Sequence, residues 1–401
     1  MSLEITESAL PLPEDWKLEN LGDVSNINMG QSPSSSAYND LGNGKYLIQG
    51  NADIKNRKTA PRIWTTEFPK VCQEGDVLMT VRAPVGAIAR SLHNACLGRG
   101  VCAITSDVVD NEYLYQYLLS YETRWAAIEQ GSTFTAVNGK DIRGIEIPLP
   151  PLAEQQKIAD ILSTVDKKMA VMDEQLAQTQ ELKWGLMQRL LTRGIGHATF
   201  KDSPLGQIPE SWEATEVQHV LTVHNTLRKP LSAEVRSSMK GEYRYYGPTG
   251  VLDYINEFML DGKYVLIGED GDHFLKYKMK KMTLLVKGKF NVNNHAHILS
   301  GNEKCLTEWF YLFYQHRDLD AYLTRQGAGR YKLTKAALQR LPIAVPSISE
   351  QEVIIELCSC IDDKLQVLTD KKTQYQELKR GLMQQLLTGQ RRVRTQAPIT
   401  A

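Results

Sequence analysis

The chain has 401 residues, enough for two or three domains of ordinary size. Its 47 Lys and Arg residues balance 47 Asp and Glu residues, and this zero net charge argues against a stand-alone nonspecific DNA binder. It contains no run of about 18 apolar residues that could span a membrane, and residues 1–16 contain no apolar signal core, so we expect a cytoplasmic protein.

A long internal repeat organises the chain. The segment QELKWGLMQRLLT at 180–192 recurs as QELKRGLMQQLLT at 376–388, an offset of 196 residues, and 11 of the 13 positions are identical. Glu154-Gln155 and Trp16 recur at the same offset as Glu350-Gln351 and Trp212. The chain therefore consists of two tandem units, each a variable globular stretch followed by a similar helix.

The first globular stretch is mixed α/β (α+β). Runs rich in β-branched residues predict strands at Asp76–Val81, Ala87–Ala89 and Val101–Ile104, and a helix is expected over Asn111–Glu129. A proline-rich segment then leads into a helix with apolar residues spaced alternately four and three apart. This seam consists of Ile158, Leu162, Val165, Met169, Met172 and Leu176.

The second globular stretch repeats this plan. Strands are predicted at Tyr264–Ile267, Thr283–Val286 and His297–Leu299, a turn-rich loop at Gly288–Asn294, and a helix over Glu308–Thr324. The second seam consists of Ile354, Cys358, Ile361, Leu365 and Leu368. In both helices the apolar pattern then shifts phase, which predicts a stutter. The shifted positions are Leu182, Leu186 and Leu190 in the first helix and Leu378, Leu382 and Leu386 in the second.

Two helices of equal length and matching seam predict an antiparallel coiled coil with a pseudo-two-fold relation between the copies. Packing of each helix on its own domain is the alternative. Gly185 and Gly381 predict a weak point or a close approach of the helices. The expected divisions are a first globular domain at 1–150, a conserved helix at 151–194, a second globular domain at 195–346, a second conserved helix at 347–390 and a flexible tail at 391–401.

Motifs for chemistry are absent from the sequence. It contains neither a GxxxxGK[ST] phosphate loop nor an Asn/Asp-Pro-Pro-Tyr/Phe adenine-methylase motif, and no HExxH. Glu269, Asp270 and Asp272 could suggest a metal site, but Gly268 and Gly271 beside them indicate an ordinary acidic turn. Six scattered cysteines fit neither a zinc ribbon nor a disulfide framework, so we expect buried reduced thiols.

Several short sequence motifs of the chain resemble those of one known family. Two variable domains alternate with two similar helices, which are entered through PLPPLAEQQ (Pro148–Gln156) and left through LMQRLLT (Leu186–Thr192). Together with IPESW (Ile208–Trp212), GDVLMTVRAPVG (Gly75–Gly86) and NVNNHAHIL (Asn291–Leu299), this order is similar to the specificity subunit of type I restriction–modification systems. The resemblance covers nearly the whole chain.

The resemblance implies a non-catalytic subunit that reads double-stranded DNA. Each variable domain would be a target recognition domain for one half of a bipartite site, and the helices would set the spacing and dock two methyltransferase subunits. Motor–nuclease subunits would complete the complex. S-adenosylmethionine, ATP and magnesium would act through those other subunits, with no cofactor or metal bound by this chain. A coiled-coil scaffold without DNA readout and an enzyme active by itself are the alternatives.

Candidate base-reading residues follow from the preference of Arg and Lys for guanine and of Asn and Gln for adenine. Their side chains lie in predicted loops, where contact with phosphate or solvent is the competing interpretation. In the first domain they are Gln31, Ser32, Tyr46, Gln49, Asn51, Arg57, Lys58 and Arg82. In the second they are Tyr245, Tyr246, Lys276, Tyr277, Lys278, Asn293, Asn294, Arg330, Tyr331 and Lys332. For Asn293 to His295 a turn, and for His297 a buried core histidine, are the alternatives.

Overall fold

The computed structural model describes residues 11–131, 136–325 and 331–394. The chain divides into two compact units. The first unit comprises Met1–Glu174 and Thr369–Ala401, and the second comprises Gln175–Leu368. Two long helices, α4 (Leu152–Arg193) and α9 (Ile348–Leu386), each contribute one half to either unit. We call the globular part of the first unit the first head and that of the second unit the second head.

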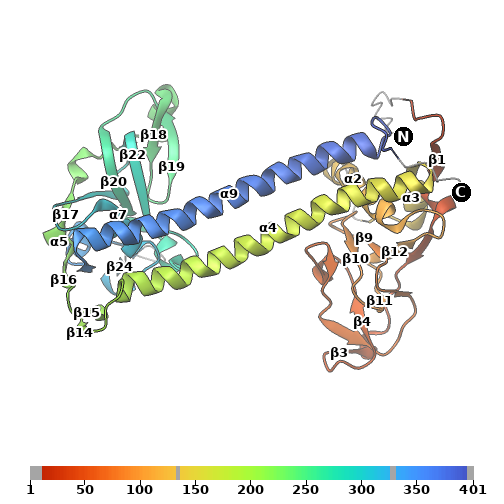
Figure 1. The fold of residues 1–401 in the computed structure, drawn as a ribbon, viewed down its shortest axis with the longest axis horizontal. Helices are drawn as coiled ribbons and strands as arrows, with labels where there is room; N and C mark the ends of the chain where they lie inside the picture. Colours follow the sequence, from red (N-terminus) through yellow and green to blue (C-terminus); the bar gives the residue numbers. More distant parts are fainter. Residues whose placement is uncertain (1–10, 132–135, 326–330, 395–401) are drawn as a thin grey trace, which may run out of the picture. The chain divides into compact units, whose positions relative to one another are not determined.

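The described part of the first head contains two large sheets, a two-stranded sheet and one long helix (Figure 1). A six-stranded sheet has the order β2-β12-β9-β10-β6-β5, and a five-stranded sheet has the order β3-β7-β4-β11-β8. The strands are β1 (Lys17–Asn20), β2 (Asn26–Met29), β3 (Tyr38–Asn39), β4 (Lys45–Ile48), β5 (Ile54–Lys55), β6 (Lys58–Thr59), β7 (Ile63–Thr65), β8 (Val71–Cys72), β9 (Val77–Thr80), β10 (Ile88–Arg90), β11 (Ala95–Leu97), β12 (Val101–Thr105) and β13 (Glu146–Leu149). The helices are α1 (Leu21–Val24), α2 (Asn111–Gly131) and α3 (Gly139–Arg143).

The second head contains one large sheet and shorter helices. Its six-stranded sheet has the order β17-β23-β20-β22-β18-β19. The strands are β14 (Phe200–Ser203), β15 (Gly206–Pro209), β16 (Glu213–Glu216), β17 (Leu221–Val223), β18 (Lys240–Tyr246), β19 (Val251–Ile255), β20 (Leu260–Gly268), β21 (Asp270–Gly271), β22 (Thr283–Val292), β23 (Ala296–Gly301), β24 (Thr324–Arg325), β25 (Tyr331–Lys332) and β26 (Pro342–Val345). The helices are α5 (Val217–Val220), α6 (Ala233–Ser238), α7 (Thr307–Tyr314) and α8 (Lys335–Gln339).

The two heads share one sheet framework. The first four strands of each six-stranded sheet pair antiparallel, and the fifth, β6 in the first head and β18 in the second, pairs parallel with its neighbour. In each head a strand near the start pairs with the strand before the long helix, β1 with β13 and β16 with β26. The five-stranded sheet of the first head has no counterpart of similar size in the described part of the second.

Each core joins a head to the ends of both long helices. In the first unit, Ile158 and Leu162 of α4 and Leu386 of α9 are buried with α2 and the central strands. In the second unit, Leu190 of α4 and Ile354 of α9 are buried against α7. Burial of such side chains contributes about 1.5–3 kcal/mol each, so the helix ends are integral parts of the folded heads.

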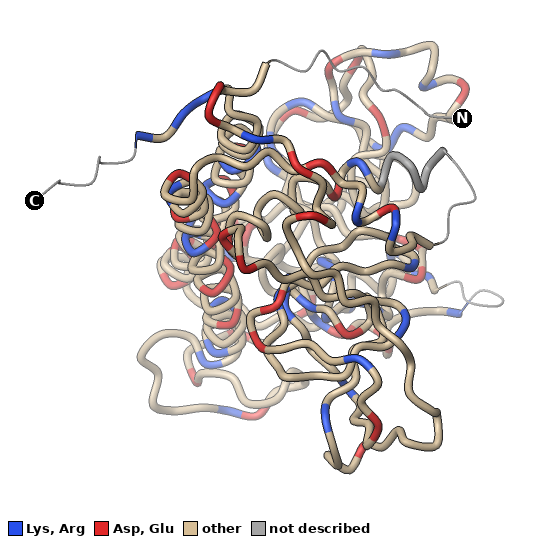
Figure 2. Tube along the Cα trace, turned by 90° about the vertical axis from the view of Figure 1, so that its right-hand side faces the viewer, with Lys and Arg blue, Asp and Glu red and all other residues tan. Residues whose placement is uncertain are grey.

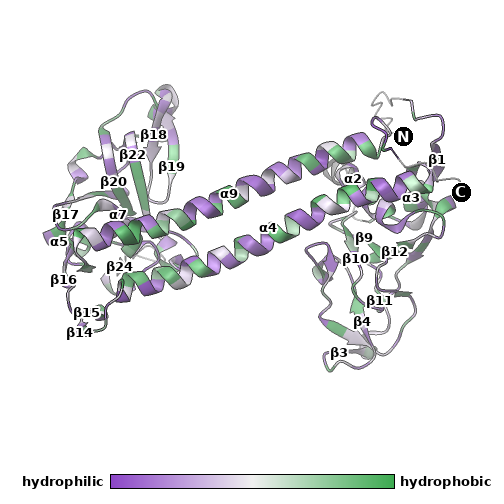
Figure 3. Ribbon diagram, viewed as in Figure 1, coloured by the Kyte–Doolittle hydropathy of each residue, from purple (hydrophilic) through white to green (hydrophobic). Residues whose placement is uncertain are grey.

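The antiparallel pairing of α4 and α9 is confirmed within each unit. In the first unit the Lys379 ammonium lies 2.7 Å from Asp166 Oδ1, and Lys372 pairs with Asp173. In the second unit Lys183 pairs with Asp362. The two residue numbers of every pair add to the same total, as an uninterrupted antiparallel register requires. Hydrophobic and hydrophilic residues alternate along both helices, and acidic and basic residues are interspersed on them (Figures 2 and 3).

The predicted stutter is wrong, because the seam keeps its phase through polar residues. Leu182 and Leu378, with which the shifted pattern begins, are 54% and 50% exposed. Leu190 and Leu386 of the same predicted set are buried, but they also fit the unshifted spacing. Thr179 and Lys183 are buried instead, in phase with Leu176. The aliphatic stem of a lysine can lie along the interface while its ammonium reaches an acceptor, here Asp362.

Gly185 and Gly381 bring no close approach of the helices, contrary to one of the two expectations for them. A Cβ atom at either position would meet nothing within 4 Å, and α4 and α9 continue through both residues.

Other boundaries differ from the prediction. The six predicted strands are confirmed, as is the helix at 111–129. The helix expected over Glu308–Thr324 is shorter, because α7 ends at Tyr314, and β22 continues through Gly288, which adopts a positive φ of 82°. The tail expected to be flexible from 391 onward is anchored at Arg392 and Val393, which hydrogen-bond to Glu154. The remaining domain boundaries are predictions.

Candidate nucleic-acid interface and helix junctions

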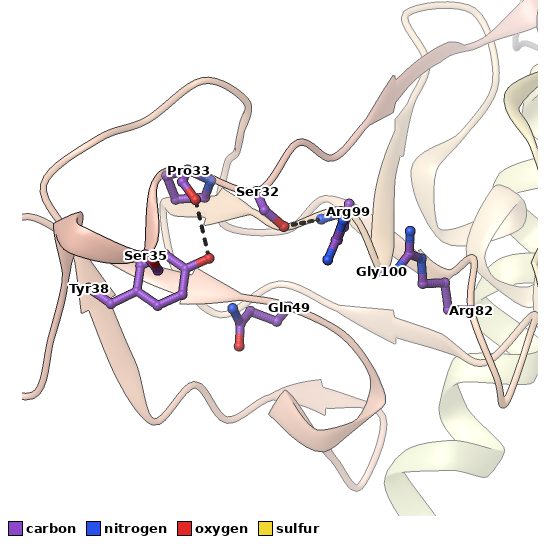
Figure 4. A pocket seen from close by; sticks show the side chains of 8 residues that line it. All are labelled: Ser32, Pro33, Ser35, Tyr38, Gln49, Arg82, Arg99 and Gly100. Atoms are coloured by element: carbon purple, nitrogen blue, oxygen red, sulfur yellow. Dashed lines mark hydrogen bonds between the residues drawn. The ribbon is translucent and has the colours of Figure 1, made fainter.

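An open pocket of about 420 Å³ lies on the first head. It brings together three of the predicted DNA-reading residues, Ser32, Gln49 and Arg82, from three separate loops. The other lining residues are Pro33, Ser35, Tyr38, Arg99 and Gly100. Figure 4 shows these side chains around one open space. Two guanidinium groups beside an amide and a hydroxyl form a donor-rich surface of the kind that recognises phosphates and the acceptor edge of guanine.

The backbone around the pocket is fixed by close contacts. The Arg99 N–H donates to Ser32 Oγ at 3.3 Å, and Tyr38 Oη donates to the Pro33 carbonyl at 3.4 Å. A Cβ atom at position 100 would lie 2.1 Å from the Gln49 carbonyl oxygen, so only glycine allows these two loops to approach. Residues that line the pocket are thus held on a rigid frame, with the exposed side chains of Arg82, Arg99 and Gln49 directed outward.

The remaining candidates of the first head lie outside this pocket. Gln31, Asn51 and Lys58 are exposed. Arg57 adopts a left-handed backbone with φ of 63° and donates to the Ile88 carbonyl and to Glu122. Tyr46 packs between Trp64 and His93, with ring centroids at 4.9 and 4.6 Å. The contacts of Arg57 and Tyr46 are therefore mainly structural.

An ion-pair network occupies the acidic turn of the second head. Glu269 pairs with Arg228, with Lys332 at 3.1 Å and with His297 at 3.9 Å. Burial alone would raise the pKa of Glu269, but hydrogen bonds from Arg228 and Lys332 lower it below the ordinary value. The Lys332 ammonium therefore pairs with the Glu269 carboxylate within the head rather than pointing freely to solvent. Among the described residues, no group of three or more His, Cys, Asp or Glu could hold a metal ion.

Several candidates of the second head are buried or form local structure. Tyr245 and Tyr246 are buried, and the Tyr245 hydroxyl donates to the Lys229 carbonyl at 2.7 Å. Asn293 Oδ1 accepts from the His295 N–H within a turn. His297 is fully buried, and its Nε2 contacts the Leu333 carbonyl at 2.7 Å. Tyr277 and Tyr331 pack against the core.

The exposed candidates of the second head form a smaller set. Asn294, Lys276 and Lys278 are exposed, and Lys276 donates to Asp272 at 2.9 Å. Arg330 lies outside the described residues.

Two arginines at these surfaces were not among the residues predicted from the sequence. Arg99 lies between Gly98 and Gly100, a glycine signal that could have marked its loop, whereas nothing in the local sequence of Arg228 indicates its pairing with distant Glu269.

A glutamate at the start of each long helix, buried Glu154 in α4 and half-buried Glu350 in α9, forms a matching junction in each unit. In the first unit Trp16 Nε1 donates to Glu154 at 3.2 Å and the Arg392 guanidinium donates to both carboxylate oxygens. In the second unit Trp212 Nε1 donates to Glu350 at 3.0 Å, and His197 Nε2 lies 2.8 Å from the same carboxylate. Each junction ties the entry of the head, the start of one helix and the residues after the other helix together.

The repeated helix segments also share exposed residues. In the second unit Gln180, Glu181, Gly185 and Gln188 are exposed and Leu182 is 54% exposed. In the first unit their counterparts Gln376, Glu377 and Gln384 are exposed, Leu378 is 50% exposed and Gly381 is half-buried. Packing within the seam does not require exposed residues to be identical in two copies.

Two copies of one sheet framework, attached to duplicated helices but bearing different surfaces, define a tandem-repeat protein with two specialised heads. A sequence profile for the type I restriction modification DNA specificity domain matches residues 13–181 and 209–379. The chain belongs to this family, and it is a DNA specificity subunit of a type I restriction–modification system.

Relatives and a solved structure agree with this assignment. The putative type I restriction enzyme MjaX specificity subunit of Methanocaldococcus jannaschii is 37% identical over 188 residues, 46% of this chain and 44% of that protein. The MjaVIII specificity subunit of the same organism is 25% identical over 414 residues, 96% of this chain and 95% of that protein. A crystal structure of the M. genitalium type I S subunit shares the fold, with a TM-score of 0.61, 16% identity and coverage of 94% and 98%.

No helix among the described residues is long and apolar enough to cross a membrane. Five of the cysteines are buried as free thiols, and Cys360 is exposed.

Proposed function

We propose that each head reads one half of a bipartite site in double-stranded DNA, the first through the pocket around Arg82 and Arg99. The observation that carries this proposal is a six-stranded framework common to both heads beneath surfaces that differ. A shared scaffold with different loops is the arrangement expected when two copies perform the same kind of task on different sequences. Because the heads differ, the two half-sites need not be related by symmetry.

The long helices have two functions in this proposal. They set the separation of the half-sites, since α4 and α9 are continuous over 42 and 39 residues and keep one register. Their repeated exposed segments, 180–188 and 376–384, dock two copies of one methyltransferase subunit. Methyl transfer from S-adenosylmethionine, and ATP- and magnesium-dependent cleavage by motor–nuclease subunits, then occur outside this chain.

Adenine-methylation sequencing tests the recognition function. Cells carrying the complete system, with or without this chain, are sequenced by a method that detects methyladenine. We expect one bipartite motif with a fixed gap, present only when the chain is present. Methylation of the same motif in the absence of the chain would contradict a role of this chain in DNA readout.

Substitutions of the repeated leucines test the docking function. Leu182→Asp or Leu378→Asp should each reduce the number of bound methyltransferase subunits from two to one, because each places a charge at the centre of one repeated face. Val353→Asp is the matched control, since Val353 is 47% exposed on α9 but has Lys157 at the equivalent position of α4. Native mass spectrometry gives the stoichiometry. Unchanged stoichiometry in both leucine variants would place the docking surface elsewhere.

A further inference from the structure

The loop between the two central strands differs in length between the heads. In each head these strands form an antiparallel pair, β9 with β10 and β20 with β22. Residues 81–87 connect the pair in the first head, and residues 269–282 connect it in the second. The first connection carries Arg82, which lines the open pocket. The longer connection of the second head therefore occupies the equivalent position in the same framework.

The tip of this longer loop exposes apolar side chains among lysines. Met279 is 88% exposed and Leu275 is 54% exposed. Lys278 and Lys280 flank Met279 in the sequence HFLKYKMKKM at 273–282, and both are exposed. Transfer of the Met279 side chain from water into an apolar environment would be favourable, and the flanking ammonium groups favour a partner that carries negative charge on both sides of an apolar contact.

Carboxylates near the base of the loop do not cancel this charge. Glu269 is paired with Arg228 and Asp272 with Lys276, and Asp270 Oδ2 lies 2.9 Å from the His295 ring. Because these acids are already paired, Lys278 and Lys280 carry the charge presented at the tip.

The loop is held in place by residues from outside it. His316 Nδ1 donates to the Tyr277 carbonyl at 2.8 Å, and Lys281 Nζ donates to the Tyr311 hydroxyl at 3.3 Å. Within the loop the N–H groups of Met279 and Lys280 both donate to the Lys276 carbonyl at 2.8 Å. The tip is thus presented on a compact turn attached to the segment around α7, which reduces the entropy lost on binding.

We propose that residues 275–280 form a wedge of the second head, in which Met279 enters a base step of the second half-site while Lys278 and Lys280 contact the flanking phosphates. Apolar side chains that insert between base pairs unstack the step, and adjacent cationic side chains offset the cost through the phosphates. The proposal rests on the proposed function. It adds that insertion of Met279 deforms the DNA, so the second head would prefer sites with an easily unstacked base step at that position.

The test uses the complete chain with its methyltransferase subunits and a duplex carrying the mapped site. The fluorescent base 2-aminopurine replaces each adenine of the second half-site in turn, since its emission rises when the base is unstacked. Met279→Ala is compared with Met259→Ala, an equally conservative change of a methionine that is 48% exposed on the same head. Lys278→Ala and Lys280→Ala are measured as a function of salt concentration.

We expect a rise in emission at one step with the wild-type chain and with Met259→Ala. Met279→Ala should lose most of this rise and bind the cognate duplex on the order of tenfold more weakly. Each lysine variant should reduce the slope of log K against log salt by about 1. The wedge is overturned if the wild-type chain discriminates the cognate duplex but Met279→Ala matches Met259→Ala in emission and affinity. A wild-type complex that shows no preference for the bipartite duplex would instead overturn the proposed function.

Discussion

Lys379 places its ammonium 2.7 Å from Asp166 Oδ1 across the antiparallel helices of the first unit. The residues related to this pair by the 196-residue offset, Lys183 and Asp362, pair in the second unit. Each pair occupies the interface between α4 and α9, where an apolar residue would otherwise lie. A polar residue at a single seam position specifies register, because a shifted alignment would leave the charge without its partner.

Removing one member of this pair should destabilise the first unit. Lys379→Ala leaves Asp166 without its cation at a position where the lysine side chain is only 13% exposed. We expect a loss of about 1–2 kcal/mol in the free energy of unfolding, measured by urea denaturation.

The matched control is Lys372→Ala. Its partner Asp173 is 55% exposed. This pair is not repeated in the second unit, because the residues that correspond to Lys372 and Asp173 at the 196-residue offset are Leu176 and Thr369. A surface pair of this kind contributes below about 1 kcal/mol. Equal losses in the two variants would mean that the Lys379 pair has no special role in the register.

Arg392 should confer a pH-dependent stability through Glu154. Burial acts to raise the pKa of Glu154, but Arg392, the Val393 N–H and Trp16 lower it below its ordinary value of 4.5. A depressed pKa stabilises the fold above the unfolded-state value, and this stabilisation is lost as the pH falls through the folded-state pKa. Arg392→Ala lets burial dominate, so we expect a deficit of about 1–2 kcal/mol at pH 7 that shrinks toward pH 4.

Thermal unfolding between pH 4 and pH 7 measures this difference. Arg391→Ala serves as the control, because the Arg391 contact at this junction is its backbone N–H, which the substitution retains. A deficit of the same size at every pH would show that Arg392 acts through packing rather than through the carboxylate.

Gly185 offers a stabilising substitution. It lies within α4, and a Cβ atom there would meet nothing within 4 Å. Gly185→Ala should therefore stabilise the isolated chain by about 0.5–1 kcal/mol, since alanine loses less backbone entropy in a helix. Urea denaturation of the chain without its partners is the measurement, and a destabilised variant would contradict the open environment around this residue.

The sequence was informative where patterns repeat along the chain. The 196-residue offset predicts the duplication and the antiparallel helices, and runs rich in β-branched and aromatic residues predict the central strands β9, β20 and β22. The seam was predicted incorrectly at Thr179 and Lys183, which are buried. A search for apolar periodicity does not find polar residues whose aliphatic atoms pack in the interface. Leucine at 182 then suggested a shift that does not occur.

The candidate site was less predictable, because it depends on contacts between distant residues. Ser32, Gln49 and Arg82 meet Arg99 only after several strands have paired, among them the parallel pair β4 and β11. Composition marks a loop arginine as a candidate but does not distinguish exposed Arg82 from Arg57, which is held by Glu122. The assignment of individual side chains to bases stays a prediction.

Substitutions in the pocket should affect only one half of the recognition site. Arg82→Ala or Arg99→Ala should reduce discrimination at one or two positions of the first half-site by about 1–3 kcal/mol, the contribution of a bidentate contact to guanine. Competition binding with duplexes randomised in either half-site measures this effect. Lys55→Ala, which removes an exposed cation on β5 outside the pocket, is the control. Uniform weakening across all sequences would identify the arginines as phosphate contacts.

Exchange of one head tests the central claim most directly. The segment from Glu213 to Val345, which runs from β16 to β26, is replaced by the corresponding head of another specificity subunit whose half-site is known, and methyladenine is mapped in cells. The account predicts that the second half-site becomes that of the donor while the first half-site and the gap are retained. A chimera that assembles and methylates DNA but keeps both original half-sites, or alters both, would contradict separate readout by two heads.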